Sequence, residues 1–214
     1  MGTVKRVNME NGTGGCARLV SAVLAFITVA VVSPLAQQTD LKLDPAKTSV
    51  RFTLDAALHT VHGTFQVKPS TLQFDPISGG ISGEILVDAK SGATGNGMRD
   101  RKMHKDVLES ERYPEISFLP DRIEGAVARQ GKSSVKVHGM FRIHGVDREI
   151  TVPAEVNMSA DLWSAAVHFA IPYAKWGMKN PSTLFLRVND SVEIDLAASG
   201  TLAEPGITIR DSPQ

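Results

Sequence analysis

Six histidines are the side chains of this sequence best suited to chemistry, because imidazole nitrogens bind transition metals and exchange protons near neutral pH. They are His59, His62, His104, His138, His144 and His168. His59 and His62 form the closest pair, but side chains three residues apart on an extended strand point to opposite faces. The sequence has no His-Glu-x-x-His motif. We therefore predict no metal site and keep a histidine-based metal or haem binder as an alternative function.

Motifs for nucleophilic and phosphate chemistry are also absent from the sequence. There is no Gly-x-Ser-x-Gly nucleophile elbow and no Gly-x-x-x-x-Gly-Lys-Ser/Thr phosphate-binding loop. Carboxylates are plentiful, with 23 Asp and Glu residues, but their spacing places no pair in a common cleft. We expect a protein that is not an enzyme, without catalytic residues and without a cofactor.

Residues 95–111 form the most distinctive stretch, a charged helical pattern within a chain that otherwise favours strands. Asn96 is suited to cap a helix, and Asp100 lies in the first turn, where a negative charge complements the helix dipole. Tyr113 and Pro114 end the pattern, since the residue before a proline disfavours the helical conformation. The pattern predicts one short helical segment near residues 97–109, and we expect it to cover an opening into an apolar interior.

The elements that must position this segment are strands, because apolar and polar residues alternate with a period of two along several runs. The runs lie at residues 50–54, 61–67, 81–87, 135–143, 165–171 and 192–198. Short turn signals such as Gln130-Gly131 and His144-Gly145 favour antiparallel pairing. Many consecutive strands of this kind are typical of a sandwich or a closed barrel.

Three glycines interrupt the apolar faces of these runs: Gly63, Gly83 and Gly139. A glycine inside a strand often marks a bulge, a bend or a close approach of another backbone. Closing a sheet into a barrel requires such bends, so the glycines favour a closed barrel.

Residues 1–36 have the composition of an export signal. Lys5, Arg6 and Arg18 precede an apolar run at residues 19–32, which is shorter than the about 20 residues needed to span a bilayer. We predict cleavage near Ala36 and a periplasmic or secreted location. The remaining chain would consist of one domain at residues 37–202 and a flexible tail at residues 203–214.

Charge and cysteine content exclude further classes of function. The 23 Lys and Arg residues balance the 23 Asp and Glu residues, so no basic excess points to nucleic acid. The single cysteine, Cys16, lies in the expected leader. The domain can therefore form no disulfide and no thiolate metal site, and its stability must come from its core.

Three blocks of residues resemble the YceI-like proteins, exported lipocalin-like barrels associated with polyisoprenoid binding. The first is Asp44–Phe52 followed by Val61–Phe65; the second is Thr94–Asp100 with His104, Leu108 and Tyr113–Phe118; the third is Val137–Arg148. The resemblance extends over roughly residues 41–202. One departure is Ser110-Glu111-Arg112, where the family often has aromatic residues.

The resemblance implies an all-β fold, a lipocalin-like antiparallel eight-stranded β-barrel that encloses one apolar ligand. It implies non-catalytic binding, carriage or storage of a long apolar lipid, namely a polyisoprenoid, an isoprenoid quinone or a similar amphiphile. The partner would be this lipid and no nucleic acid, while a transient membrane contact and a homodimer stay open. A stress-response partner protein with a filled barrel is the remaining alternative.

Alternation and resemblance together select the expected ligand-binding residues. On the strands these are Phe52, Phe65, Ile85, Val137, Phe141, Val167 and Phe169. At the mouth, Met98, Met103 and Leu108 would line the opening with adaptable side chains. Arg99 would meet an anionic head group there.

Overall fold

The computed structural model describes residues 38–183 and 187–203 of the chain. The expected leader at residues 1–36 lies outside this part, as does the expected tail at residues 203–214, except for Ala203, which is the last residue of a strand. Strands and one short helical segment make up nearly all regular structure, which confirms the predicted all-β fold. No helix in the described part is long and apolar enough to span a bilayer.

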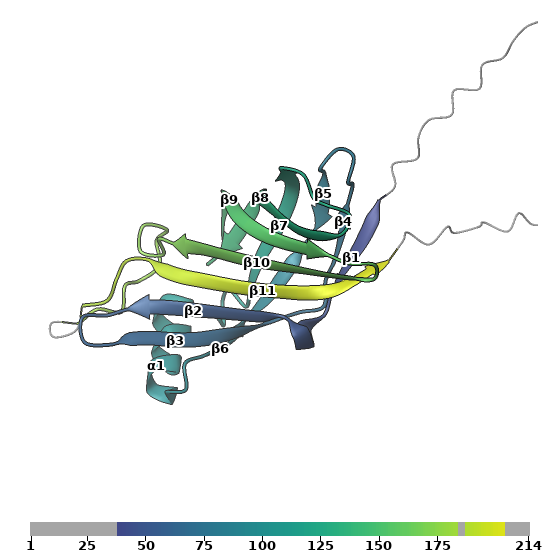
Figure 1. Cartoon of the computed structure of the whole chain (residues 1–214). Coiled ribbons are helices and arrows are strands. Elements are labelled where there is room, and N and C mark those ends of the chain that lie inside the picture. The colour runs from purple at the N-terminus through teal and green to yellow at the C-terminus, as the bar shows by residue number, and fades with distance from the viewer. Residues whose placement is uncertain (1–37, 184–186, 204–214) are drawn as a thin grey trace, which may run out of the picture. The chain divides into compact units, whose positions relative to one another are not determined.

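Eight strands form a closed antiparallel ring (Figure 1). In ring order they are β2 (Ser49–Asp55), β3 (Thr60–Val67), β6 (Ile85–Ala93), β7 (Glu115–Glu124), β8 (Gly131–Ile143), β9 (Val146–Met158), β10 (Leu162–Ile171) and β11 (Val192–Ala203). The ring closes because β11 pairs with both β10 and β2. The predicted ring of eight strands is thus confirmed.

Three further strands close one end of the ring. β1 (Thr39–Leu43) pairs with β11 and with β4 (Thr71–Phe74), and β4 pairs with β5 (Ile81–Gly83). A bridge between Gly80 and Arg122 joins this group to β7. A 3₁₀ turn, η1 (Pro45–Lys47), links β1 to β2. Buried side chains of the added strands pack with Trp163 of β10, so this end of the interior is shielded from solvent.

The helical segment follows β6, as predicted. α1 (Gly97–Lys102) begins after Asn96, whose side chain accepts hydrogen bonds from the backbone N–H groups of Met98 and Arg99, both at 3.1 Å. The Asp100 carboxylate accepts one hydrogen bond from the Thr94 backbone N–H at 2.9 Å and another from the Thr94 hydroxyl. α1 continues directly into a π-helical turn, η2 (Met103–Val107), which the sequence pattern does not predict.

Close backbone approaches require all three strand glycines; at Gly63, for example, a Cβ would lie 2.7 Å from the Ala93 carbonyl oxygen. Gly83, the last residue of β5, has a φ of 115°, and a Cβ there would lie 2.6 Å from the Thr71 carbonyl oxygen. The prediction of one continuous strand over 81–87 is therefore wrong, because this conformation breaks the extended chain. Gly139 in β8 faces β7, where a Cβ would lie 2.4 Å from the Leu119 carbonyl oxygen and 2.7 Å from the Pro120 Cα. The pairing of β7 with β8 shifts register just after Pro120, which marks a bulge.

Gly139→Ala should destabilise the domain, because the added Cβ would meet backbone atoms of β7 that cannot rotate aside. We expect the free energy of unfolding to fall by about 1–3 kcal/mol, measured by urea denaturation. Gly97→Ala is the matched control, since its Cβ would meet only the flexible Arg101 side chain at 3.6 Å and alanine favours a helix. Equal losses in the two variants would contradict this account of the β7–β8 contact.

Candidate ligand-binding cavity

The interior of the ring is a cavity of about 630 Å³. Its wall is built from inward side chains of all eight ring strands, together with α1, η2 and the loops that follow β2 and β10. The wall is almost entirely apolar, because alternation turns one apolar face of each strand inward. Such a wall offers water few hydrogen-bond partners and suits an apolar ligand.

All eleven side chains predicted to bind the ligand lie on this wall. They are Phe52, Phe65, Ile85, Met98, Arg99, Met103, Leu108, Val137, Phe141, Val167 and Phe169. Two aromatic pairs shape the interior: the Phe52 and Phe65 rings lie 5.4 Å apart, and the Phe141 and Phe169 rings lie 6.1 Å apart with their planes nearly perpendicular. Contact of these side chains with a ligand stays a prediction.

Trp163 lies at the closed end of the cavity. Its side chain packs in a buried cluster with Leu41 and Phe74, and its indole Nε1 has no hydrogen-bond partner within the described residues. Gly200 leaves room for the indole, since a Cβ there would lie 2.7 Å from Nε1. The sequence pattern did not predict Trp163 as a wall residue, although the alternation of β10 extends to it from Ala165.

Polar side chains gather at the opposite end of the cavity, which we call the mouth. Arg99 donates a hydrogen bond from Nε to the Thr94 hydroxyl at 2.8 Å and another from Nη2 to the Thr94 carbonyl at 3.0 Å. Lys102 donates to the Pro181 carbonyl at 3.0 Å, which joins α1 to the loop after β10. Both cations line the cavity, so positive charge is concentrated at the mouth.

A histidine fastens the helical segment to β6. His104 Nε2 lies 2.8 Å from the Gly92 carbonyl oxygen, and Nδ1 lies 3.0 Å from the Ser110 hydroxyl. A carbonyl oxygen only accepts, so Nε2 carries a proton and, in the neutral ring, Nδ1 accepts from Ser110. Ser110 is only 3 % exposed, and neither side chain lines the cavity. This serine–histidine pair therefore positions the helical segment. It also explains why a small residue, Ser110, stands where the family often has an aromatic residue.

The loop after β10 forms another part of the mouth. Tyr173 lines the cavity and donates its hydroxyl to the Asn189 carbonyl at 2.5 Å. Burial, together with the negative charge of Asp190, raises the pKa of Tyr173 to about 12. Trp176 packs under Arg148, whose guanidinium carbon lies 5.0 Å from the ring centre and whose Nη2 donates to the Trp176 carbonyl at 3.2 Å.

The histidines do not assemble a metal site in the described part of the chain. No group of three or more His, Cys, Asp or Glu side chains there has the arrangement needed to hold a metal ion. Among the six histidines only His59 lines the cavity. On the outer face of the ring, His168 Nδ1 lies 2.8 Å from Asp195 Oδ1. In the turn between β8 and β9, His144 Nε2 lies 3.2 Å from Glu109 Oε1.

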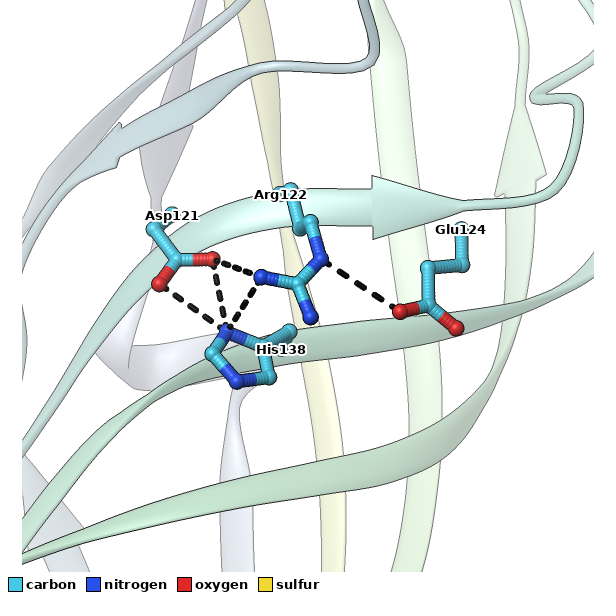
Figure 2. Close-up of polar contacts among 4 residues, drawn as sticks. All are labelled: Asp121, Arg122, Glu124 and His138. Carbon is cyan, nitrogen blue, oxygen red and sulfur yellow. Dashed lines mark hydrogen bonds and ion pairs between the residues drawn. The ribbon is translucent and has the colours of Figure 1, made fainter.

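The largest of these clusters surrounds His138 and comprises four residues (Figure 2). His138 does not line the cavity. Its Nδ1 lies 2.8 and 2.9 Å from the two carboxylate oxygens of Asp121 and 3.2 Å from Nη1 of Arg122. The Nε of Arg122 lies 3.3 Å from Glu124 Oε1. Asp121 and Arg122 belong to β7 and His138 belongs to β8, so we interpret the cluster as a structural contact between these two strands.

A model of the YceI-like domain matches residues 41–199. The chain belongs to the YceI-like family. Proteins named UPF0312 from Pseudomonas savastanoi pv. phaseolicola and Pseudomonas syringae pv. tomato are each 31% identical to it over 100 residues. That alignment covers 45% of this chain and half the length of those relatives.

Solved structures share this YceI-like fold. BcnA of Burkholderia cenocepacia matches with a TM-score of 0.62 at 21% identity, over 74% of this chain and 99% of BcnA. A polyisoprenoid-binding domain from Saccharophagus degradans matches with a TM-score of 0.60 at 16% identity, over 77% and 98%. A YceI protein of Campylobacter jejuni matches with a TM-score of 0.55 at 19% identity, over 69% and 88%. At these identities the likeness shows the fold alone.

The buried phenol at the mouth gives a direct test of this geometry. The chain has two tyrosines, so Tyr113→Phe leaves Tyr173 as the only phenol. We expect its absorbance titration to reach half-ionisation at about 12 rather than at the usual value of about 10. Because the folded pKa is the higher one, stability contributed by the neutral phenol is complete below pH 10 and is lost as pH rises through about 12. Half-ionisation near pH 10 in the folded variant would contradict the burial described here.

Proposed function

We propose that the protein carries or stores one long apolar lipid inside the ring, without catalysing a reaction. The observation that supports this most directly is the cavity of about 630 Å³ with an almost entirely apolar wall. The Saccharophagus degradans neighbour is described as a polyisoprenoid-binding domain, so a polyisoprenoid, an isoprenoid quinone or a similar amphiphile is the ligand class we propose.

The size of the cavity suits one extended hydrocarbon chain. A cavity of roughly 150 Å³ accommodates one benzene molecule, so about 630 Å³ corresponds to roughly 25 carbon atoms. Each buried methylene contributes about 0.8 kcal/mol, which amounts to about 20 kcal/mol for such a chain. This exceeds the association cost of about 4–15 kcal/mol, so apolar contacts alone suffice for tight binding.

We propose that the ligand lies with its apolar tail toward Trp163 and its head group at the mouth. Arg99 and Lys102 would then meet an anionic or strongly polar head group. The same arrangement fits export, because a lipid that crosses an aqueous compartment must be shielded from water. A periplasmic or secreted location is therefore part of the proposal.

The alternative functions receive less support. A filled barrel would require a packed interior, whereas the ring encloses a cavity. A histidine-based metal or haem site would require histidines that converge, whereas five of the six do not line the cavity.

Filling the cavity should remove the lipid. Ala165→Trp places an indole on the inner face of β10, where Ala165 lines the cavity. We expect the lipid recovered by organic extraction and mass spectrometry to fall at least roughly tenfold, because the indole displaces several methylenes worth about 0.8 kcal/mol each.

Ala166→Trp is the matched control, because Ala166 is the next residue of the strand and is exposed on the outer face. It should retain the lipid of the unsubstituted protein, and circular dichroism should show both variants folded. If the unsubstituted folded protein yields no apolar small molecule and takes up none from detergent micelles, the proposed function is wrong.

A further inference from the structure

Two strongly exposed apolar side chains stand at the mouth of the cavity. Met98 in α1 lines the cavity and is nevertheless 76% exposed. Leu58, in the turn between β2 and β3, is 79% exposed. Single exposed apolar residues are common on protein surfaces, so their location decides what they mean. These two residues belong to separate segments of the same rim.

The turn that carries Leu58 is fastened to this rim. The Ala56 N–H donates to the His59 carbonyl at 3.2 Å, and the Ala57 N–H donates to the Arg187 carbonyl at 2.8 Å. Ala56 and His59 line the cavity, whereas Leu58 between them does not. Leu58 therefore extends outward from the mouth into solvent.

The helical segment adds exposed positive charge to the rim. Arg101, Lys102 and Lys105 are exposed, whereas Asp100 and Asp106 in the same segment are half-buried. The whole chain contains equal numbers of basic and acidic residues, so this group of cations is a local excess. A local excess of this kind attracts an anionic surface.

Two acidic side chains near the rim are engaged within the protein. The Asp55 carboxylate accepts a hydrogen bond from the Thr60 hydroxyl at 2.8 Å. The Asp190 carboxylate accepts one from the Asn180 side-chain amide at 2.7 Å. These internal contacts fix the orientation of the two carboxylates, which are exposed and keep their negative charge.

We propose that this rim docks on an anionic lipid bilayer, with Leu58 and Met98 entering the interface and the cations of α1 and η2 meeting lipid head groups. The inference rests on the proposed function, since a long apolar chain must reach the cavity without crossing water. Apolar side chains beside cations are typical of surfaces that bind membranes. Docking in this orientation brings the mouth against the bilayer, so the lipid chain can enter the cavity without passing through bulk water.

Leu58→Asp tests the apolar contact. In co-sedimentation with vesicles of equal parts phosphatidylcholine and phosphatidylglycerol, we expect it to partition roughly tenfold more weakly than the unsubstituted protein, because a carboxylate would have to enter the interface. Ile77→Asp is the matched control: Ile77 is 77% exposed and lies in the turn between β4 and β5, at the closed end. It should bind the vesicles as the unsubstituted protein does.

A charge reversal tests the electrostatic contact. Arg101→Glu combined with Lys105→Glu should weaken binding to these vesicles roughly tenfold or more and change binding to pure phosphatidylcholine little. Lys132→Glu combined with Lys136→Glu is the control, since both lysines are exposed on β8 away from the mouth. Added salt should weaken binding of the unsubstituted protein.

Uptake of a fluorescent polyprenol from detergent micelles separates docking from ligand binding. Leu58→Asp should retain this uptake, because Leu58 is not part of the wall. The docking proposal is overturned if Leu58→Asp and Ile77→Asp lose vesicle binding equally, or if the unsubstituted protein does not bind vesicles that contain phosphatidylglycerol. It is also overturned if Leu58→Asp only converts a dimer to a monomer, in which case a second copy covers the rim. A protein that binds vesicles but neither yields nor takes up any apolar small molecule would overturn the proposed function alone.

Discussion

The pairing of β10 with β11 is the contact on which the interior depends. Ten residue pairs join the two strands, from Leu162 opposite Thr201 to Ile171 opposite Val192. Without this pairing both strands would be open edges, and the apolar faces of the sheet would have no opposite wall. When β10 pairs with β11, the backbone N–H and C=O groups of neighbouring strands are hydrogen-bonded to one another around the ring. Only side chains then face the interior, and these give water almost no hydrogen-bond partners.

The strand pattern of the sequence predicted which side chains face this interior, because each side chain of a strand must alternate between two faces. Phe52, Phe65 and Phe141 all lie where the alternation placed them. The pairing that closes the ring could not be predicted in this way, since it joins strands by contacts that leave no local signal. The short strands β1 and β4 were not predicted for a related reason. Each has few apolar residues, and these are buried only because the strands pack across the end of the ring.

The helical segment shows the same division between local and distant causes. Asn96 caps α1 as the sequence indicates, because capping is decided by neighbouring residues. The contact of His104 with Gly92 and Ser110 was not foreseen, because it requires the segment to lie back against β6. The eleven candidate ligand-binding residues could be selected from spacing and resemblance. The roles of the exposed Leu58 and the buried Trp163 could not, because they follow from the positions of these residues at the two ends of the cavity.

The placement of the two tryptophans has a practical consequence. The chain contains only two tryptophans, Trp163 and Trp176. Trp163 packs against β1 and β4 at the closed end of the cavity, whereas Trp176 lies under Arg148 in the loop after β10, near the mouth. Indole emission responds to the polarity around the ring. With Trp176 replaced by phenylalanine, Trp163 would be the single tryptophan, located at the closed end of the cavity. Its emission spectrum would then distinguish ligands that reach the closed end from ligands held near the mouth.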